Sequence, residues 1–314
     1  MSDAPTATTA SPESTAPGKK PMSNLSQRIL FAVIGAAILL FCVWYSVWTF
    51  ALFFGLVQTR MLWEFYRMMR EAGYKPAALL GGGISVLIFA SFFFFSVEQG
   101  GPNSFDYVAS SGWHTVIFPG YLLSAPIILL PILLILREMY AWPRKNQEIN
   151  PFANVGINLL GLLYVSLPMS FLNVVSYGPA GYDYRRVLVL LLLVWSSDIG
   201  AYAAGKTFGK HKLAPKISPG KTWEGAIGGF LLTLGMGWAL GYLLPELSVT
   251  YRLAVAGVVA VFGPLGDLAE SMLKRSVGVK DSGRIMPGHG GLLDRFDAFL
   301  FILPVLALLQ LVAG

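Results

Sequence analysis

The chain has 314 residues, of which 55% are hydrophobic and only 13% are charged, and its formal net charge is +6. A soluble domain usually carries about 25% charged residues, so these few charges cannot cover a water-facing surface. We therefore expect an all-α, polytopic integral membrane protein embedded in a lipid bilayer.

The N-terminal residues 1–24 are rich in Ala, Ser, Thr and Pro and lack the apolar content needed to fold. We expect a disordered cytoplasmic tail there. Lys19, Lys20 and Arg28 then precede an apolar run, as in a signal peptide, but no small-x-small cleavage site follows. We therefore expect the first helix to be retained. Cys42 is the single cysteine, which excludes an intrachain disulfide.

Nine apolar runs of membrane-spanning length follow one another along the chain. They lie at 28–45, 46–66, 77–97, 118–137, 153–174, 186–205, 223–244, 252–272 and 292–312. The first two are nearly continuous, which leaves either one long helix or a tight hairpin around Trp44-Tyr45-Ser46. The positive-inside rule favours the hairpin, because two crossings place most of the 23 lysines and arginines on the cytoplasmic side with the N-terminus. We therefore predict about nine transmembrane helices, a cytoplasmic N-terminus and an external C-terminus.

Acidic residues gather in the later half of the chain. The last four helices contain or adjoin Asp198, Glu224, Asp267, Glu270, Asp294 and Asp297. On insertion scales they would together cost roughly 15–20 kcal/mol if all of them faced lipid. That exceeds a typical folding stability, so they must face one another, a cavity, cations or basic partners. We expect 181–314 to be the catalytic region and 25–180 to be a transmembrane scaffold that could also serve in dimerisation.

Asp294 and Asp297 stand three residues apart after two glycines, in GGLLDRFD. On a helix this spacing places both carboxylates on one face. Hard oxygen ligands beside a phosphate favour Mg²⁺, so a metal site is one interpretation. The alternative is that Asp294 pairs with Arg284 or Arg295 while Asp297 caps a helix.

Asp267 and Glu270 repeat this spacing in GPLGDLAESMLKR. Glu270 lies four residues before Lys274, so a structural salt bridge is an equally good interpretation for Glu270. Asp267 has no such local partner, which favours a functional role for it.

The segment between the sixth and seventh runs, GKTFGKHKLAPKISPGKTWEG, is rich in lysine. Its SPGKT part (218–222) resembles the end of a phosphate-binding P-loop, but Pro215 stands where a glycine is required and no strand precedes it. A glycine followed by Lys221 at the start of a helix is still suited to bind an anion. The alternative is that the lysines only orient the protein in the membrane, which leaves SPGKT leading into Glu224 unexplained.

A second basic loop adjoins the paired carboxylates. It contains Lys274, Arg275, Lys280, Asp281, Arg284 and His289. Basic groups beside paired carboxylates are what a nucleoside triphosphate with Mg²⁺ requires, because the cations neutralise the phosphate oxygens. His289 stands between glycines and is either a phosphate ligand or proton shuttle, or a turn residue with a structural hydrogen bond.

With these residues in place, the segment SMLKRSVGVKDSGRIMPGHGGLLDRFD (271–297) resembles the signature of phosphatidate cytidylyltransferases, also called CDP-diacylglycerol synthases. The polar and glycine positions of that signature are filled by Ser271, Lys274, Arg275, Lys280, Asp281, His289, Gly290, Gly291, Asp294, Arg295 and Asp297. Met286 is a mild departure, since Leu, Ile or Phe is usual there. The segments SDIGAY (197–202), SPGKTWEG (218–225) and GDLAES (266–271) also resemble parts of the family, so the resemblance covers about 115 residues.

The resemblance implies a reaction in which the phosphate of phosphatidic acid attacks the α-phosphorus of CTP and pyrophosphate leaves. It also implies a divalent metal, expected to be Mg²⁺, on Asp267, Asp294 and Asp297, with a monovalent cation such as K⁺ as an option beside it. The residues expected to act in catalysis are Lys221, Lys274, Arg275, Lys280, Asp281, His289 and Arg295. Of these, Lys221, Lys274, Arg275 and Lys280 are expected to hold phosphates. The residues expected to bind substrate are Asp198, Ser218, Lys221, Thr222, Glu224 and Ser271. Asp198 is expected to support the metal or an essential lysine.

Two other functions compete with cytidylyl transfer. A transporter would also carry intramembrane acids and glycine hinges, but it would more often show two related halves. A CTP-dependent lipid kinase needs the same cations but transfers the γ-phosphate. We expect a nucleotidyltransferase of phospholipid biosynthesis whose active site faces the cytoplasm, in the inner or plasma membrane if the source is bacterial. Its expected partners are CTP, phosphatidic acid and the lipid bilayer, with no nucleic acid, and the resemblance adds the expectation of a homodimer.

Overall fold

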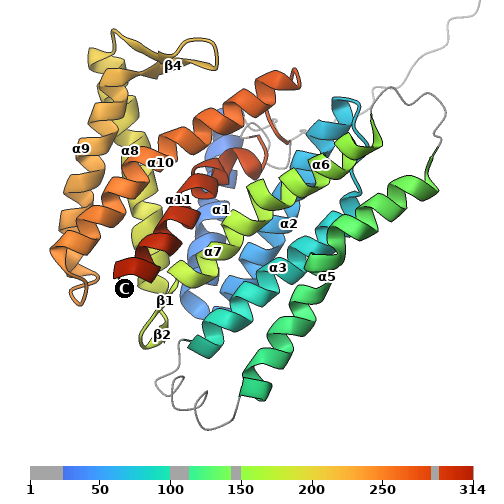
Figure 1. Cartoon of the computed structure of the whole chain (residues 1–314). Helices are drawn as coiled ribbons and strands as arrows, with labels where there is room; N and C mark the ends of the chain where they lie inside the picture. The colour runs from blue at the N-terminus through green and yellow to red at the C-terminus, as the bar shows by residue number, and fades with distance from the viewer. Residues whose placement is uncertain (1–23, 100–112, 143–149, 284–289, 314) are drawn as a thin grey trace, which may run out of the picture.

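The computed structural model describes residues 24–99, 113–142, 150–283 and 290–313. Within these ranges the chain is almost entirely helical, and the helices pack side by side as a bundle (Figure 1). The helices are α1 (Asn24–Tyr45), α2 (Val47–Glu71), α3 (Ala78–Gln99), α5 (Trp113–Tyr140), α6 (Pro151–Gly161), α7 (Leu167–Val175), α8 (Tyr184–Phe208), α9 (Trp223–Ala239), α10 (Val249–Ser276) and α11 (Leu293–Ala313). A π-helical turn at Leu162–Ser166 joins α6 to α7, and a 3-10 turn at Leu240–Tyr242 extends α9.

Each apolar run predicted from the sequence coincides with a helix or with the joined pair α6–α7. The all-α membrane architecture is therefore confirmed. Six segments of the described residues are long and apolar enough to cross a membrane: Ala78–Val97, Pro151–Val175, Tyr184–Phe208, Trp223–Tyr242, Val249–Ser276 and Leu293–Val312. The expectation of nine crossings stays a prediction for α1, α2 and α5.

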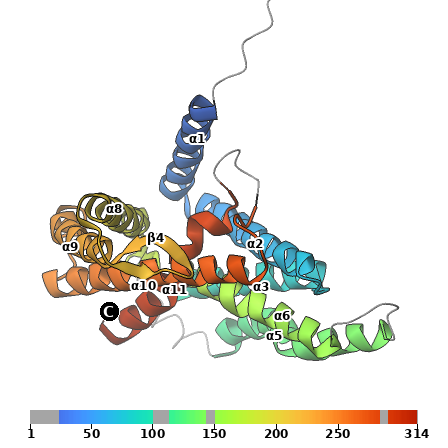
Figure 2. The same ribbon diagram turned by 90° about the horizontal axis from the view of Figure 1, so that it is seen from above.

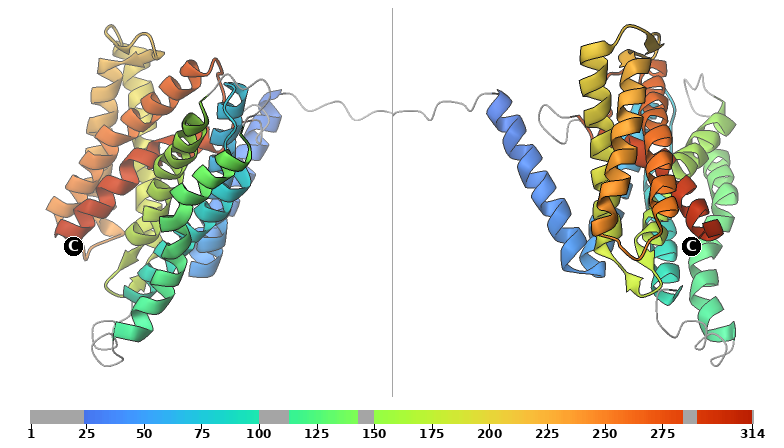
Figure 3. Two further views of the ribbon diagram at one scale, coloured as in Figure 1. Left: turned by 45° about the vertical axis from the view of Figure 1, so that its right-hand side comes forward. Right: turned by 90° about the vertical axis from the view of Figure 1, so that its left-hand side faces the viewer.

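The chain breaks between the first two helices at Ser46. Its backbone is extended (φ −163°, ψ 152°), and its hydroxyl accepts a hydrogen bond from Trp48 N at 3.2 Å, which caps α2. The run 28–66 is therefore two helices and not one. From Ser46, α1 leans away from the rest of the bundle, as Figures 2 and 3 both show.

Two short antiparallel hairpins lie at opposite ends of the bundle (Figure 1). The hairpin of β1 (Tyr177–Gly178) and β2 (Gly181–Tyr182) joins α7 to α8 at one end. The hairpin of β3 (Lys212–Ala214) and β4 (Ser218–Thr222) joins α8 to α9 at the other. This second end also holds the C-terminal ends of α2 and α10, so the lysine-rich segment and the signature segment lie at the same end.

The regions predicted as scaffold and catalytic region share one hydrophobic core. In sequence order the core runs from α1 and α2 through α7 and α8 to α11. Phe54 of α2 meets Phe296 of α11 edge-on at 6.1 Å between ring centres, and α7 packs along α11. The early helices therefore support the later ones directly.

The first half is less plainly apolar than its sequence suggests. Gln58 of α2 is fully buried and donates a hydrogen bond to Ser85 O at 2.9 Å. Its amide oxygen accepts one from Ser170 Oγ at 3.1 Å. Such buried polar groups are tolerated because each finds a partner, and they tie α2 to α3 and α7.

Candidate active site

The site begins where α10 and α11 cross at Gly266. A Cβ atom added to Gly266 would lie 2.6 Å from Asp297 O and 3.1 Å from Ala298 Cα, so the two backbones are in direct contact there. Only glycine permits this approach without moving one helix. The residues beside the contact, Asp267 on α10 and Asp297 on α11, are thereby brought into one place.

A cavity of about 1080 Å³ opens beside this crossing. Its charged part is lined by Asp198, Lys206, Lys221, Asp267, Asp294, Arg295 and Asp297. Its apolar part is lined by residues of α1, α2 and α8, among them Ile38, Leu39, Phe53, Val57, Leu191 and Val194. Polar and apolar surfaces thus meet in a single cavity, whose volume slightly exceeds the usual range of about 300–1,000 Å³ for ligand sites.

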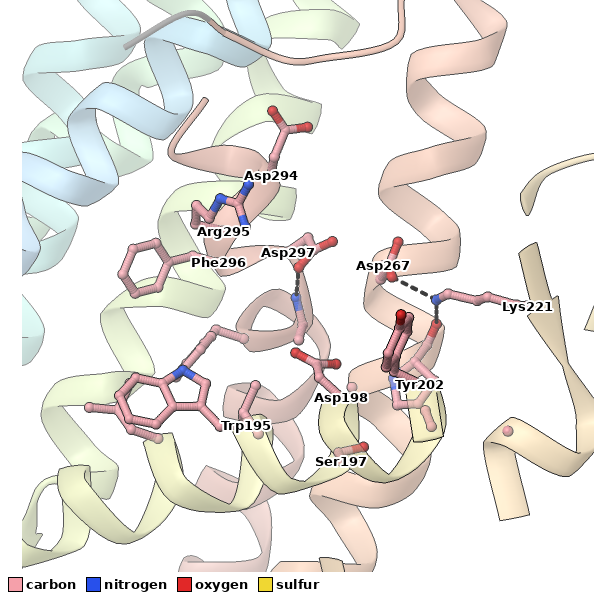
Figure 4. A pocket seen from close by; sticks show the side chains of 18 of the residues that line it. Trp195, Ser197, Asp198, Tyr202, Lys221, Asp267, Asp294, Arg295, Phe296 and Asp297 are labelled. Carbon is pink, nitrogen blue, oxygen red and sulfur yellow. Dashed lines mark hydrogen bonds and ion pairs between the residues drawn. The ribbon is translucent and has the colours of Figure 1, made fainter. Parts of the chain in front are cut away.

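Three carboxylates from three helices share the charged part of the cavity. Figure 4 shows Asp198 of α8, Asp267 of α10 and Asp297 of α11 pointing into the same space. Asp198 and Asp297 each interact electrostatically with Asp267. Among the described residues, no group of three or more His, Cys, Asp and Glu side chains is already arranged to hold a metal ion. The predicted metal set of Asp267, Asp294 and Asp297 therefore stays a prediction, and Asp198 joins two of its members in this space.

Lys221 reaches this space from β4. Its ammonium group lies 2.8 Å from Asp267 Oδ2 and donates a hydrogen bond to Pro264 O at 3.1 Å (Figure 4). The pairing of β4 with β3 fixes the backbone on one side of Lys221. On the other side Thr222 caps α9, because its hydroxyl accepts a hydrogen bond from Gly225 N at 3.1 Å. Lys221 is therefore held by a hairpin and a helix cap with its charge inside the cavity.

Asp294 is turned away from the three other carboxylates, although it lines the same cavity (Figure 4). Its Oδ1 lies 2.7 Å from Lys274 Nζ. Its Oδ2 accepts hydrogen bonds from Gly291 N at 2.7 Å, Ser282 N at 3.0 Å and Ser282 Oγ at 2.9 Å. Lys274 also pairs with the fully buried Glu270, so the salt bridge weighed for Glu270 is confirmed. Lys274 thus pairs with two acids, one of them fully buried near the C-terminal end of α10.

Several other predicted residues support this arrangement from close by. Ser271 donates a hydrogen bond to Asp267 Oδ1 at 3.2 Å. Glu224 lies 2.6 Å from His211 Nδ1 and so ties the start of α9 to the start of the hairpin, outside the cavity. Ser218 pairs with Ala214 within the hairpin.

The remaining predicted residues lie away from the cavity or outside the described residues. Lys280 and Asp281 are exposed in the loop after α10. Arg275 is also exposed, and its guanidinium lies 3.4 Å from Val279 O. His289 falls outside the described residues. The signature therefore lines the cavity only with its C-terminal end, from Leu292 to Asp297, and the described basic residues before that end do not line it.

Sequence reasoning missed three features of this site. Trp195 and Tyr202 of α8 form part of the cavity wall around Asp198 (Figure 4). Glu64 of α2, which lies in the expected scaffold, is fully buried and contacts the backbone at Leu293. A carboxylate inside the apolar run 46–66 was the available signal for Glu64, because a charge in such a run needs a partner.

The family whose model matches the chain is described as the cytidylyltransferase family, and the match covers residues 26–312. The phosphatidate cytidylyltransferase of Bacillus subtilis (strain 168) is 34% identical over 288 residues, which are 91% of this chain and 97% of the relative. Those of Staphylococcus aureus (strain COL) and Staphylococcus haemolyticus (strain JCSC1435) are 45% and 44% identical over 159 residues, half of this chain. The latter two matches span 60% of the length of each relative.

Proposed function

Because this chain belongs to the cytidylyltransferase family, we propose that it transfers the cytidylyl group of CTP to phosphatidic acid, giving CDP-diacylglycerol and pyrophosphate. The observation that carries the proposal is the cavity in which an apolar wall adjoins charged residues. A diacyl lipid and a nucleoside triphosphate need such a site, because one substrate is mostly apolar and the other is a polyanion.

The apolar wall suits the lipid. Residues of α1, α2 and α8 line it, and the six helices that can cross a membrane include α8, α10 and α11 of the same cavity. A lipid whose chains lie against this wall would present its phosphate to the charged part. The phosphate of phosphatidic acid is already an anion, so the attack requires little help from a general base.

The chemical barrier is the approach of an anionic phosphate to a polyanionic triphosphate. An oxygen of the lipid phosphate forms a bond to the α-phosphorus, and the bond from that phosphorus to the bridging oxygen breaks as pyrophosphate leaves. Fixed cations that neutralise the phosphate oxygens lower this barrier. Lys221 is placed for that role, since its ammonium lies inside the cavity and can exchange Asp267 for a phosphate oxygen. Arg295 also lines the cavity and is proposed to hold a phosphate.

Mg²⁺ is part of this proposal, with a monovalent cation such as K⁺ as an option beside it. Asp198, Asp267 and Asp297 are hard oxygen donors that point into one space, which fits a divalent cation. When bound there, the cation would supply positive charge that offsets the charge of the departing pyrophosphate. Asp294, engaged by Lys274 and Ser282, would hold the start of α11 beside them.

We further propose that the cavity opens towards the cytoplasm and that the N-terminus lies on the same side, with nine crossings in all. The support is the positive-inside rule, because the lysine-rich hairpin and the signature lie at one end of the bundle. Lys216→Cys in a Cys42→Ser background tests this, since a membrane-impermeant maleimide would label it in inverted vesicles and not in right-side-out ones. Chemical cross-linking in the same membranes tests the proposed homodimer.

The function is tested with detergent-purified protein, labelled CTP, phosphatidic acid and Mg²⁺. The expected products are a labelled lipid and pyrophosphate. Release of labelled CDP with an unlabelled lipid product would identify a lipid kinase instead. Solute flux in proteoliposomes without turnover of CTP would identify a transporter, and either result would overturn the proposal.

A further inference from the structure

Glu64 connects α2 to the signature loop between α10 and α11. Its side chain is fully buried. Glu64 Oε2 accepts a hydrogen bond from Leu293 N at 3.0 Å, at the first residue of α11. The same oxygen lies 3.2 Å from Ser282 Oγ, 218 residues further along the chain. A helix of the early half therefore supplies the polar partner for the start of α11.

Arg67, one helical turn after Glu64, contacts the same residue of the loop, Ser282. Arg67 Nη2 donates a hydrogen bond to Ser282 O at 2.8 Å. The spacing i, i+3 places both side chains on one face of α2. Ser282 has no solvent exposure, and both its amide and its hydroxyl also lie against Asp294. The contacts therefore run from α2 through Ser282 to Asp294, and from there to Lys274.

Two glycines of the signature segment make room for this carboxylate. A Cβ atom added to Gly283 would lie 2.5 Å from Glu64 Oε1, and one added to Gly291 would clash with Glu64 Oε2 and with Ser282 Oγ. Neither glycine has a positive φ, so conformational freedom does not explain why glycine stands there. The proximity of Glu64 does explain it.

From these contacts we infer that Glu64 and Arg67 are positioning residues for the reaction, which act through Ser282 to hold Asp294 and the start of α11. The inference rests on the proposed function. It assigns to α2 a role that the signature cannot contain, because both residues precede the signature by more than 200 positions. Neither residue lines the cavity, so neither is proposed to touch the substrates.

The experiment compares matched pairs of variants on α2. Glu64→Ala is paired with Gln58→Ala, because both side chains are fully buried and hydrogen-bonded. The hydrogen bonds of Gln58 go to α3 and α7 and not to the signature loop. Arg67→Met is paired with Arg70→Met, whose guanidinium lies over the Trp63 ring and not against the loop. The Arg67 pair also keeps the test decisive if Glu64→Ala does not fold. Each purified protein is assayed for kcat and for KM of CTP and phosphatidic acid, beside the wild type.

Glu64→Ala and Arg67→Met are expected to lower kcat about tenfold or more, because displacement of a reacting group by about 1 Å can cost about 10²-fold. KM for phosphatidic acid is expected to change less than about threefold, since the apolar wall is untouched. The two control variants are expected to keep kcat within about threefold. Glu64→Gln, which retains an acceptor for Leu293 N, is expected to recover most of the activity.

The inference is overturned if Glu64→Ala and Gln58→Ala lower kcat equally. It is also overturned if the kcat of Arg67→Met equals that of Arg70→Met. Equal losses of activity would mean that the buried polar side chains of α2 serve only to fold the protein. Failure of the wild type to form labelled CDP-diacylglycerol would instead overturn the proposed function. The two failures are distinguished because the wild-type assay precedes the comparison of the variants.

Discussion

Substitution of Gly266 by Ala adds one methyl group at the contact between α10 and α11. The new Cβ would lie 2.6 Å from Asp297 O and 3.1 Å from Ala298 Cα, whereas ordinary contact begins at 3.4 Å. The atom that it meets first is a backbone oxygen, which has no side-chain rotamer by which to escape. The helices must therefore separate by about 0.8 Å at this point.

The expected loss of stability is modest. Overpacking of a well-packed interior costs about 1–3 kcal/mol. Ala is favoured over Gly within a helix by about 0.5–1 kcal/mol, which offsets part of that cost. The expected loss of activity is much larger, because Asp267 and Asp297 are neighbours of the contact and would move with their helices. A displacement near 1 Å can cost about 10²-fold in rate, so we expect kcat/KM to fall by roughly that factor.

Gly263→Ala is the matched control, one turn earlier on α10 and on the face towards α11. There a Cβ would lie 3.5 Å from Ile302 Cδ1 and 3.9 Å from Ala298 Cβ, which is ordinary contact. This variant is expected to retain activity. Its free energy of unfolding is expected to rise by up to about 0.8–1.0 kcal/mol, because alanine is favoured over glycine within a helix. The assay is formation of labelled lipid from CTP and phosphatidic acid, with thermal unfolding of the same samples. Equal activity of the two variants would refute the view that close helix contact sets the distance between the carboxylates.

Three further predictions concern the charged residues and the metal. Lys221→Met is expected to lower kcat/KM by about 10²-fold or more in steady-state assays, while Lys216→Met on the exposed turn of the same hairpin stays within about twofold. Lys274→Met is expected to lower the free energy of unfolding by about 3–5 kcal/mol, because the buried Glu270 loses its partner; thermal or denaturant unfolding measures this. Adding Glu270→Gln to this variant is expected to restore part of the lost stability. Removal of divalent cations with EDTA is expected to abolish lipid labelling and excess Mg²⁺ to restore it; labelling that persists after exhaustive chelation would contradict the metal proposal.

Most helices could be predicted because their apolar runs have the length of a bilayer crossing and end at loops with charges, Gly or Pro, although the runs 28–45 and 46–66 meet without such a loop. The break near Ser46 could be predicted from the positive-inside rule. The direction of α1 could not, because it depends on one extended residue and its hydrogen bond with Trp48 N. The polar contacts of Gln58 were also hidden, since a single glutamine in an apolar run does not reveal its partners on α3 and α7.

The acidic residues of the site could be predicted because each is costly in a membrane and must be compensated. Their grouping could not. Local spacing places Asp294 and Asp297 on one face of α11, yet Asp294 turns to Lys274 and Ser282, while Asp198 from α8 joins Asp267 and Asp297. Spacing along one helix does not predict which neighbouring segment supplies the hydrogen-bond donors. The position of those donors decides where a carboxylate points.

The balance of charge in the cavity links the structure to the proposed chemistry. Asp267 is paired with Lys221, but no ion pair within the described residues joins Asp198 or Asp297 to a lysine or arginine. A triphosphate that entered beside these carboxylates would be repelled, because like charges in a medium of low dielectric constant interact strongly. A cation between the carboxylates and the nucleotide would remove this repulsion. The proposed metal would reconcile the acids of α8, α10 and α11 with the phosphates of CTP, because it would supply positive charge that the acids lack within the described residues.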